Sequence, residues 1–146
     1  MHSDQLIKKL SFELSASSGN VVALGLDIVL IPRIEESLRK FGERFETRLF
    51  TPAEAAYART APGQQAERLA ARFAAKEATI KALSLGEAGV DWRDIEVIRK
   101  DDGSCSMALH NRAAAALRAL GAGRLLVCLS HDGDYAAAVV AALSDT

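Results

Sequence analysis

The stretch from Leu69 to Leu83, LAARFAAKEATIKAL, constrains the fold more than any other part of the chain. At helical spacing its large apolar side chains fall on one side and form a core stripe. They are Leu69, Phe73, Ile80 and Leu83. Most of the remaining surface is alanine, and such small side chains let other backbones come close. The stretch therefore predicts a central helix that is buried nearly all round.

Three charged side chains lie close together in the second half of this helix. Lys76 projects into the middle of the apolar stripe, Glu77 lies at its edge, and Lys81 lies one turn beyond Glu77. Buried charges are costly unless they meet a metal, a counter-charge or a ligand. Spacing alone favours an ordinary Glu77–Lys81 surface pair, worth about 0.2–0.5 kcal/mol. The position of Lys76 among alanines favours a functional site, so both interpretations stay open.

Length and charge exclude several classes of protein. At 146 residues the chain is long enough for one domain with a real core. Its net charge of −1 gives no case for nucleic acid or an anionic membrane as partner. It has no apolar run that could span a bilayer, no signal peptide, and two cysteines without metal-ligand or disulfide-scaffold spacing. We therefore expect a cytoplasmic protein.

A second candidate site residue lies in the first predicted strand. Residues 21–31, VVALGLDIVLI, are apolar on both faces except at Asp27. The same face carries Ala23 and Gly25, so other chain or a ligand can approach the carboxylate closely. A water-facing edge aspartate is the weaker interpretation, because both neighbours on each side are apolar. A buried carboxylate requires a cation.

The next segment predicts two helices. Residues 32–49, PRIEESLRKFGERFETRL, open with proline and keep an apolar stripe opposite a basic side, which we expect to face solvent. Thr51-Pro52-Ala53-Glu54 has the pattern of a capping box and starts a further helix through about Arg59.

The second half of the chain predicts mainly strands. A hairpin over residues 95–110 turns at Asp101-Asp102-Gly103. Asn111 is expected to cap an alanine-rich helix. Residues 125–131 and 135–143 predict two more strands joined by a tight turn. His131 ends the first of them, where a histidine is ordinarily a turn residue.

Together these elements predict an α+β fold in a single domain spanning residues 21–146. We expect a mostly antiparallel sheet of about five strands, packed on a long central helix and shorter helices. Residues 1–20 are expected to form an N-terminal extension, with a weakly ordered helix followed by a small-residue linker.

Three motifs, taken together, resemble one family. GLDIV and IPRI lie between Gly25 and Ile34, RFAAKEA starts at Arg72 and precedes Lys81-Ala82, and Ser130-His131 precedes an apolar strand. In this order and spacing they resemble holo-[acyl-carrier-protein] synthase, the short-type 4'-phosphopantetheinyl transferases. The resemblance covers about residues 21–143.

The resemblance implies an enzyme of fatty acid and related lipid biosynthesis. It would transfer 4'-phosphopantetheine from coenzyme A to a serine of an apo acyl carrier protein and release adenosine 3',5'-bisphosphate. Asp27 and Glu77 match the family's magnesium ligands, and oxygen ligands suit Mg²⁺. Lys81 is expected to stabilise the pyrophosphate. Glu77, directly or through a bound water, is expected to accept the serine proton.

The resemblance also implies binding residues and an assembly. Coenzyme A is expected to contact Lys81, with Arg72 or Lys76 at further phosphate oxygens, and Ser130 and His131 near its adenosine 3'-phosphate. The carrier-protein-binding residues implied are Arg33, Arg44 and Arg48. The family typically forms a homotrimer with active sites at subunit interfaces.

Two alternatives stay open. One is a non-catalytic relative that binds a carrier protein or synthase as a module, and the other is a domain that binds a different nucleotide diphosphate. Joint retention of Asp27, Glu77 and Lys81 favours the enzyme. The chain departs from the family at residues 83–86, Leu-Ser-Leu-Gly in place of Phe-Gly-Thr-Gly, and at residues 103–105, Gly-Ser-Cys in place of Gly-Lys-Pro.

Overall fold

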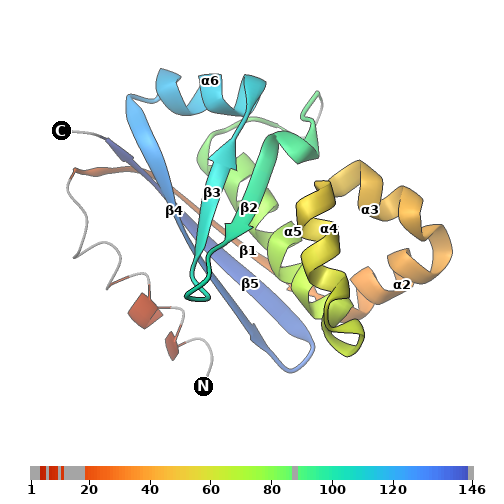
Figure 1. Cartoon of the computed structure of the whole chain (residues 1–146). Helices are drawn as coiled ribbons and strands as arrows, with labels where there is room; N and C mark the ends of the chain where they lie inside the picture. Colours follow the sequence, from red (N-terminus) through yellow and green to blue (C-terminus); the bar gives the residue numbers. More distant parts are fainter. Residues whose placement is uncertain (1–3, 6, 10, 12–18, 87–88, 145–146) are drawn as a thin grey trace.

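The computed structural model describes residues 4–5, 7–9, 11, 19–86 and 89–144 (Figure 1). The elements follow in the order β1 (Val21–Leu30), α2 (Ile31–Phe41), α3 (Glu43–Leu49), α4 (Pro52–Arg59), η1 (Pro62–Gln64), α5 (Gln65–Ala82), η2 (Trp92–Asp94), β2 (Ile95–Arg99), β3 (Cys105–Leu109), α6 (Asn111–Ala119), β4 (Ala122–Asp132) and β5 (Tyr135–Ser144). This is the expected α+β class with antiparallel strand pairing.

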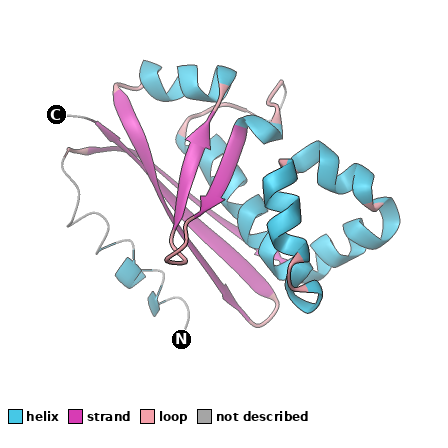
Figure 2. Cartoon of the chain, viewed as in Figure 1, coloured by secondary structure: helices cyan, strands magenta, loops and turns pink. Residues whose placement is uncertain are grey.

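Helix α5 is the centre of the molecule. It packs on the three-stranded sheet β1-β5-β4 and also contacts α2, α4 and β2. Figure 2 shows helices α2 to α4 gathered at one side of the sheets. Leu69, Ala70, Ala74 and Ala78 of α5 are completely buried, as the alanine-rich pattern predicts. The central helix is therefore covered by sheet on one side and by helices and a hairpin elsewhere.

Strand β1 lies unusually close to α5. A Cβ atom on Gly25 would stand 1.9 Å from the carbonyl oxygen of Ala78, far inside any contact distance. Glycine is required here because no side chain fits between strand and helix. The alternation of β1 then directs Asp27 and Val29 toward α5 as well. The opposite face of β1 carries exposed apolar side chains.

Most sequence-based boundaries are confirmed. The capping box is present: Thr51 Oγ1 accepts from the backbone N–H of Glu54, while a Glu54 carboxylate oxygen accepts from that of Thr51. The hairpin turns where expected, with the Lys100 N–H donating to the Ser104 carbonyl. The last two strands extend slightly beyond the predicted limits.

Three expectations need correction. The five strands form two sheets, β1-β5-β4 and the β2–β3 hairpin. The single helix predicted over residues 32–49 is broken at Gly42, whose φ of 55° ends one helix before the next begins. Asn111 does not cap α6, because His110 is the N-cap and Asn111 is already its first residue, with φ of 51°.

The N-terminal extension is described only in part. Residues 4–5, 7–9 and 11 have helical backbone. Of the predicted small-residue linker, residues 15–18 lie outside the described ranges, and only Gly19 and Asn20 are described. No helix within the described ranges is long and apolar enough to cross a membrane.

Candidate functional site

An ion pair joins β1 to the last turn of α5. Lys81 Nζ donates to Asp27 Oδ1 at 2.9 Å and to the Leu26 carbonyl at 3.1 Å. The Asp27 side chain is 16% exposed and that of Lys81 55%. The sequence predicts that Asp27 needs a cation. In the structure that cation is the ammonium group of Lys81, 54 residues further along the sequence.

Glu77 belongs to the same charged group. It lies half-buried on α5, one turn before Lys81. The hydrogen bond that Lys81 donates to Asp27 raises the pKa of Lys81, and the charges of Asp27 and Glu77 add to that increase. Lys81 on α5 donates its hydrogen bond to Asp27 on β1, and Glu77 acts on Lys81 through its charge. An ordinary Glu77–Lys81 surface pair therefore does not describe this group fully.

Two carboxylates from different elements could hold a hard divalent cation. Asp27 comes from β1 and Glu77 from α5, and both act on the same ammonium group. Within the described residues, no group of three or more His, Cys, Asp or Glu side chains is arranged to hold a metal. A cation here would therefore take its further oxygen ligands from a substrate and from water, as Mg²⁺ commonly does.

Lys76 has a different environment from Lys81. Its side chain is completely buried, and Nζ donates to Glu54 Oε1 at 2.8 Å and to the Trp92 and Ile95 carbonyls. Burial lowers the pKa of this ammonium, opposed by the charge of Glu54. Glu54 Oε2 in turn accepts the Val97 N–H at 2.9 Å. Lys76 therefore has no exposed surface to offer a phosphate, and we do not retain it as a coenzyme A ligand.

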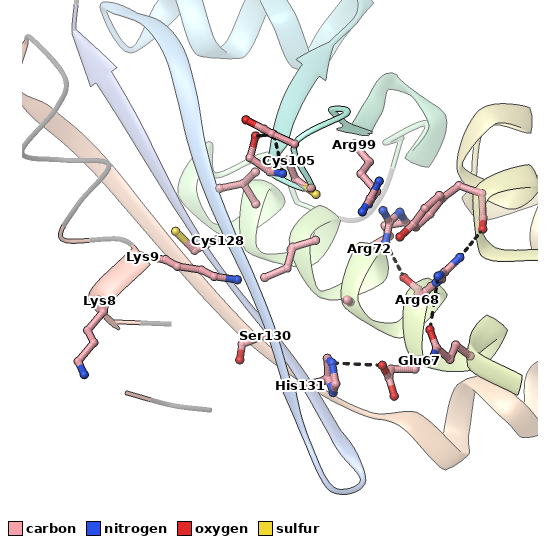
Figure 3. Close-up of a pocket in the computed structure, with 18 residues that line it drawn as sticks. Lys8, Lys9, Glu67, Arg68, Arg72, Arg99, Cys105, Cys128, Ser130 and His131 are labelled. Atoms are coloured by element: carbon pink, nitrogen blue, oxygen red, sulfur yellow. Dashed lines mark hydrogen bonds and ion pairs between the residues drawn. The ribbon is translucent and has the colours of Figure 1, made fainter. Parts of the chain in front are cut away.

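A basic cavity of about 760 Å³ lies between α5, β4 and the β2–β3 hairpin (Figure 3). Its cationic lining residues are Lys8, Lys9, Arg68, Arg72 and Arg99. Ser130 and His131 line it from β4. The cavity therefore brings together three of the predicted coenzyme A-binding residues, namely Arg72, Ser130 and His131.

The cavity residues are held by contacts between elements. Arg72 is only 4% exposed, its guanidinium donates to the Arg68 carbonyl at 3.2 Å, and burial lowers its pKa. His131 Nε2 lies 3.2 Å from Glu67 Oε1, which links the end of β4 to α5. Burial also raises the pKa of the Cys105 thiol in the cavity wall, which keeps it protonated and weakly nucleophilic.

The predicted site residues form two groups rather than one. Asp27, Glu77 and Lys81 are outside the described lining of the cavity. Asp27 lies on β1 and His131 on β4, the two edge strands that flank β5. Helix α5 covers the sheet between them. Within one chain the two groups of residues therefore lie on different edge strands of the sheet that α5 covers.

The predicted carrier-binding arginines lie at the helical side of the molecule. Arg33 is on α2, and Arg44 and Arg48 are on α3, all three exposed. Among the described residues none of them is within ion-pair distance of a carboxylate. Because α2 follows β1 directly, Arg33 lies six residues after Asp27.

Several cavity residues were missed by the sequence interpretation. Arg68 could have been found, because it lies one helical turn before Arg72 on the same face. Tyr57 and Arg99 carry no such signal, since α4 and β2 meet α5 only through long-range packing. Lys8 and Lys9 belong to the extension, to which the sequence assigned no chemistry.

Comparison with known proteins identifies the class. Residues 23–140 match the 4'-phosphopantetheinyl transferase superfamily, so the chain belongs to that superfamily. Within it, the chain is similar to proteins named holo-[acyl-carrier-protein] synthase. That of Koribacter versatilis is 44% identical over 82% of this chain and 96% of its own length. That of Moorella thermoacetica is 50% identical over 79% of this chain and 88% of its own length.

Solved structures agree with this assignment. The ACPS–CoA complex of Chronobacterium ammoniagenes has a TM-score of 0.73 and 35% identity, covering 85% of this chain and 98% of its own. The Helicobacter pylori holo-[acyl-carrier-protein] synthase in complex with coenzyme A has a TM-score of 0.71 and 28% identity, covering 82% and 98%. The overall fold of this chain is thus similar to that of these coenzyme A complexes.

Proposed function

We propose that the chain is a holo-[acyl-carrier-protein] synthase. It transfers 4'-phosphopantetheine from coenzyme A to a serine hydroxyl of an apo acyl carrier protein. The observation that carries the proposal is the convergence of Asp27, Glu77 and Lys81 from β1 and α5. It is supported by the similarity to synthases over most of the chain.

The site residues have distinct tasks in this reaction. Asp27 and Glu77 would hold Mg²⁺, which when bound neutralises charge on the pyrophosphate of coenzyme A. Lys81, whose pKa is raised, stays protonated at neutral pH and donates to a pyrophosphate oxygen. Glu77 accepts the serine proton. The serine oxygen bonds to the β-phosphorus while the bond from that phosphorus to the bridging oxygen breaks, and adenosine 3',5'-bisphosphate leaves with the oxygen.

The basic cavity is the other half of the coenzyme A site in this proposal. Arg72, Ser130 and His131 line it, and its lining carries more cationic than acidic side chains. A phosphorylated nucleotide suits that charge. Because the Asp27 group lies on the opposite flank of α5, one coenzyme A molecule would contact the two half-sites from two different copies of the chain.

We propose a homotrimer with active sites at the subunit interfaces. The outer face of β1 supports it, since Leu24, Leu26 and Ile28 are 60%, 52% and 61% exposed. A row of exposed apolar side chains of this kind ordinarily packs against another protein surface. The resemblance to the family supplies the number three.

The carrier protein is proposed to dock on α2 and α3. Arg33, Arg44 and Arg48 are exposed there without carboxylate partners among the described residues. An acidic carrier protein would therefore gain attraction without first breaking ion pairs, and the attraction would accelerate association.

One experiment tests the function directly. The chain is incubated with coenzyme A, Mg²⁺ and an apo carrier protein, and the carrier is weighed by mass spectrometry. The proposal expects one phosphopantetheine added per carrier molecule, and no addition with Asp27→Ala at the same Mg²⁺ concentration. A carrier that binds yet keeps its mass would indicate the non-catalytic module. Absence of any interaction with coenzyme A would indicate a different nucleotide ligand.

A further inference from the structure

Three arginines surround one aromatic ring at the wall of the basic cavity. The guanidinium carbons of Arg68, Arg72 and Arg99 lie 4.3, 4.5 and 5.1 Å from the centroid of the Tyr57 ring. Arg68 and Arg72 come from α5, Arg99 from the end of β2, and Tyr57 from α4. Figure 3 shows the three arginines converging on one side of the cavity. Tyr57, on a third element, is therefore the point at which α5 and β2 bring positive charge together.

The cluster has no acid in direct contact with it, although the charge of the buried Glu54 carboxylate acts on Arg72 from a distance. Among the described residues, no carboxylate lies within ion-pair distance of these three guanidinium groups. Arg68 donates instead to the Tyr57 carbonyl at 2.9 Å and to Thr60 Oγ1 at 2.7 Å, both neutral acceptors. Three like charges this close repel one another. The electron-rich ring face offsets part of that repulsion, and the remainder favours binding of an anion.

The geometry suits a phosphate group with two negative charges. Guanidinium groups bind phosphate oxygens in pairs of parallel hydrogen bonds, and a group of them surpasses a single lysine. Coenzyme A has one such group, the 3'-phosphate at its adenosine end. Its pyrophosphate is at the far end of the nucleotide and is assigned above to Lys81 and its carboxylate neighbours.

We infer that Tyr57 is a positioning residue which holds Arg68, Arg72 and Arg99 as one phosphate-binding cluster, and that the cluster takes the 3'-phosphate of coenzyme A. This inference rests on the proposed function and adds Arg68 and Arg99 to the binding residues. The ring face is the part of Tyr57 that contacts the arginines. Phenylalanine would therefore keep the function of Tyr57, and an aliphatic side chain of similar size would lose it.

The test compares coenzyme A with 3'-dephospho-coenzyme A by titration calorimetry. The wild-type protein is expected to prefer coenzyme A, and Tyr57→Phe is expected to keep that preference. Tyr57→Leu should weaken coenzyme A binding by roughly tenfold and leave 3'-dephospho-coenzyme A binding nearly unchanged. In the transfer assay the KM for coenzyme A should rise while kcat stays constant. A residue with a merely structural role would not change the ratio between the two ligands.

A second variant keeps the test valid if Tyr57→Leu fails to fold. Arg99 is exposed, so Arg99→Gln removes one guanidinium without opening the core, and it should reduce the same preference. The matched control is Arg112→Gln on α6, an exposed arginine outside the cavity lining, which should behave as wild type. A wild-type ratio in Arg99→Gln and in folded Tyr57→Leu overturns the inference alone. A wild-type protein that binds no coenzyme A overturns the proposed function and the inference together.

Discussion

Two lysines five positions apart on α5 have opposite environments. Lys81 is 55% exposed and reaches Asp27, whereas Lys76 has no exposed surface and reaches Glu54. An exposed ammonium can exchange its carboxylate partner for a phosphate at small cost. A buried one cannot, because leaving its partner would strand two charges without water. The difference supports the role in catalysis proposed for Lys81 and favours a structural role for Lys76.

The buried pair makes a sharp prediction. Lys76→Met should reduce the free energy of unfolding by about 3–5 kcal/mol, because it leaves the Glu54 carboxylate buried and unpaired. The double variant Lys76→Met with Glu54→Leu should recover much of that loss, since no charge is then stranded. Urea unfolding of Lys76→Met, Glu54→Leu and the double variant, together with the wild type, completes a double-mutant cycle. A Lys76→Met protein as stable as wild type, but deficient in coenzyme A binding, would return Lys76 to the nucleotide site.

A single residue at the end of α5 stores backbone strain. Ser84 has φ of 53°, and the backbone N–H groups of Ser84 and Leu85 donate to the carbonyls of Lys81 and Ile80. This is the Schellman arrangement, whose left-handed position glycine fills best. The departure from the family's glycine at this position therefore costs conformational energy rather than altering the turn.

Ser84→Gly should accordingly stabilise the protein by about 0.5–1 kcal/mol, because glycine adopts this conformation without steric cost. Thermal unfolding should show a higher Tm for Ser84→Gly, while Ser84→Ala, which keeps the Cβ atom, should stay near wild type. A glycine variant that is less stable than the alanine variant would contradict the strain argument.

At the scale of elements, the approach of β1 to α5 sets the geometry of the charged cluster. Gly25→Ala would place a Cβ atom 1.9 Å from the Ala78 carbonyl oxygen and 3.2 Å from the Ala82 Cβ. The strand must then move away from the helix, which we expect to cost at least about 1–3 kcal/mol. Transfer activity should fall further than stability, because Asp27 moves with the strand and away from Lys81.

Gly63→Ala is the matched control, since the space around its Cβ position is open. Calorimetric unfolding and the transfer assay on both variants separate the two effects. Equal activity of Gly25→Ala and Gly63→Ala would show that the spacing between β1 and α5 does not govern the site.

The helices α2 and α3 yield a prediction about partner choice. Arg33→Glu should raise the KM for the carrier protein by about tenfold and leave that for coenzyme A unchanged, because the charge reversal repels an acidic partner. Wild-type activity should also fall with added salt, which screens exposed charges. Arg112→Glu, on α6, controls for the change in net charge. An equal rise in both KM values would indicate that Arg33 belongs to the nucleotide site.

For the whole molecule, the separation of the half-sites predicts complementation between inactive variants. Asp27→Ala removes the β1 half-site and His131→Ala impairs the β4 half-site. In a mixed trimer, some interfaces join the intact β1 half-site of one copy to the intact β4 half-site of another. Dissociating and reassembling the two variants together should therefore restore part of the wild-type rate. Mixtures that stay as inactive as the separate variants would contradict a shared site.

The proposed homotrimer can be tested by a substitution on the outer face of β1. Leu26→Glu changes a side chain that is 52% exposed in the chain, so the fold should survive. A buried charge between subunits is costly, and light scattering should show the homotrimer dissociate with loss of transfer. A wild-type protein that is monomeric and fully active would contradict this prediction.

Local patterns alone determined much of this protein. The alanine-rich helix, the capping box and the hairpin turn depend on neighbours within a few residues, so periodicity and turn chemistry are enough to predict them. Local patterns also predict that some charges need a partner, namely Asp27 in its apolar strand and the lysines of α5.

Only the tertiary structure decided which partner each charge meets. Lys76 meets Glu54 from 22 residues away, and Lys81 meets Asp27 from 54 residues away. Tyr57 gathers arginines from two other elements, and α5 divides the half-sites. Burial and pairing depend on which elements pack together, and packing depends on the shape and close approach of distant segments, as at Gly25 and Ala78. No local pattern contains that information.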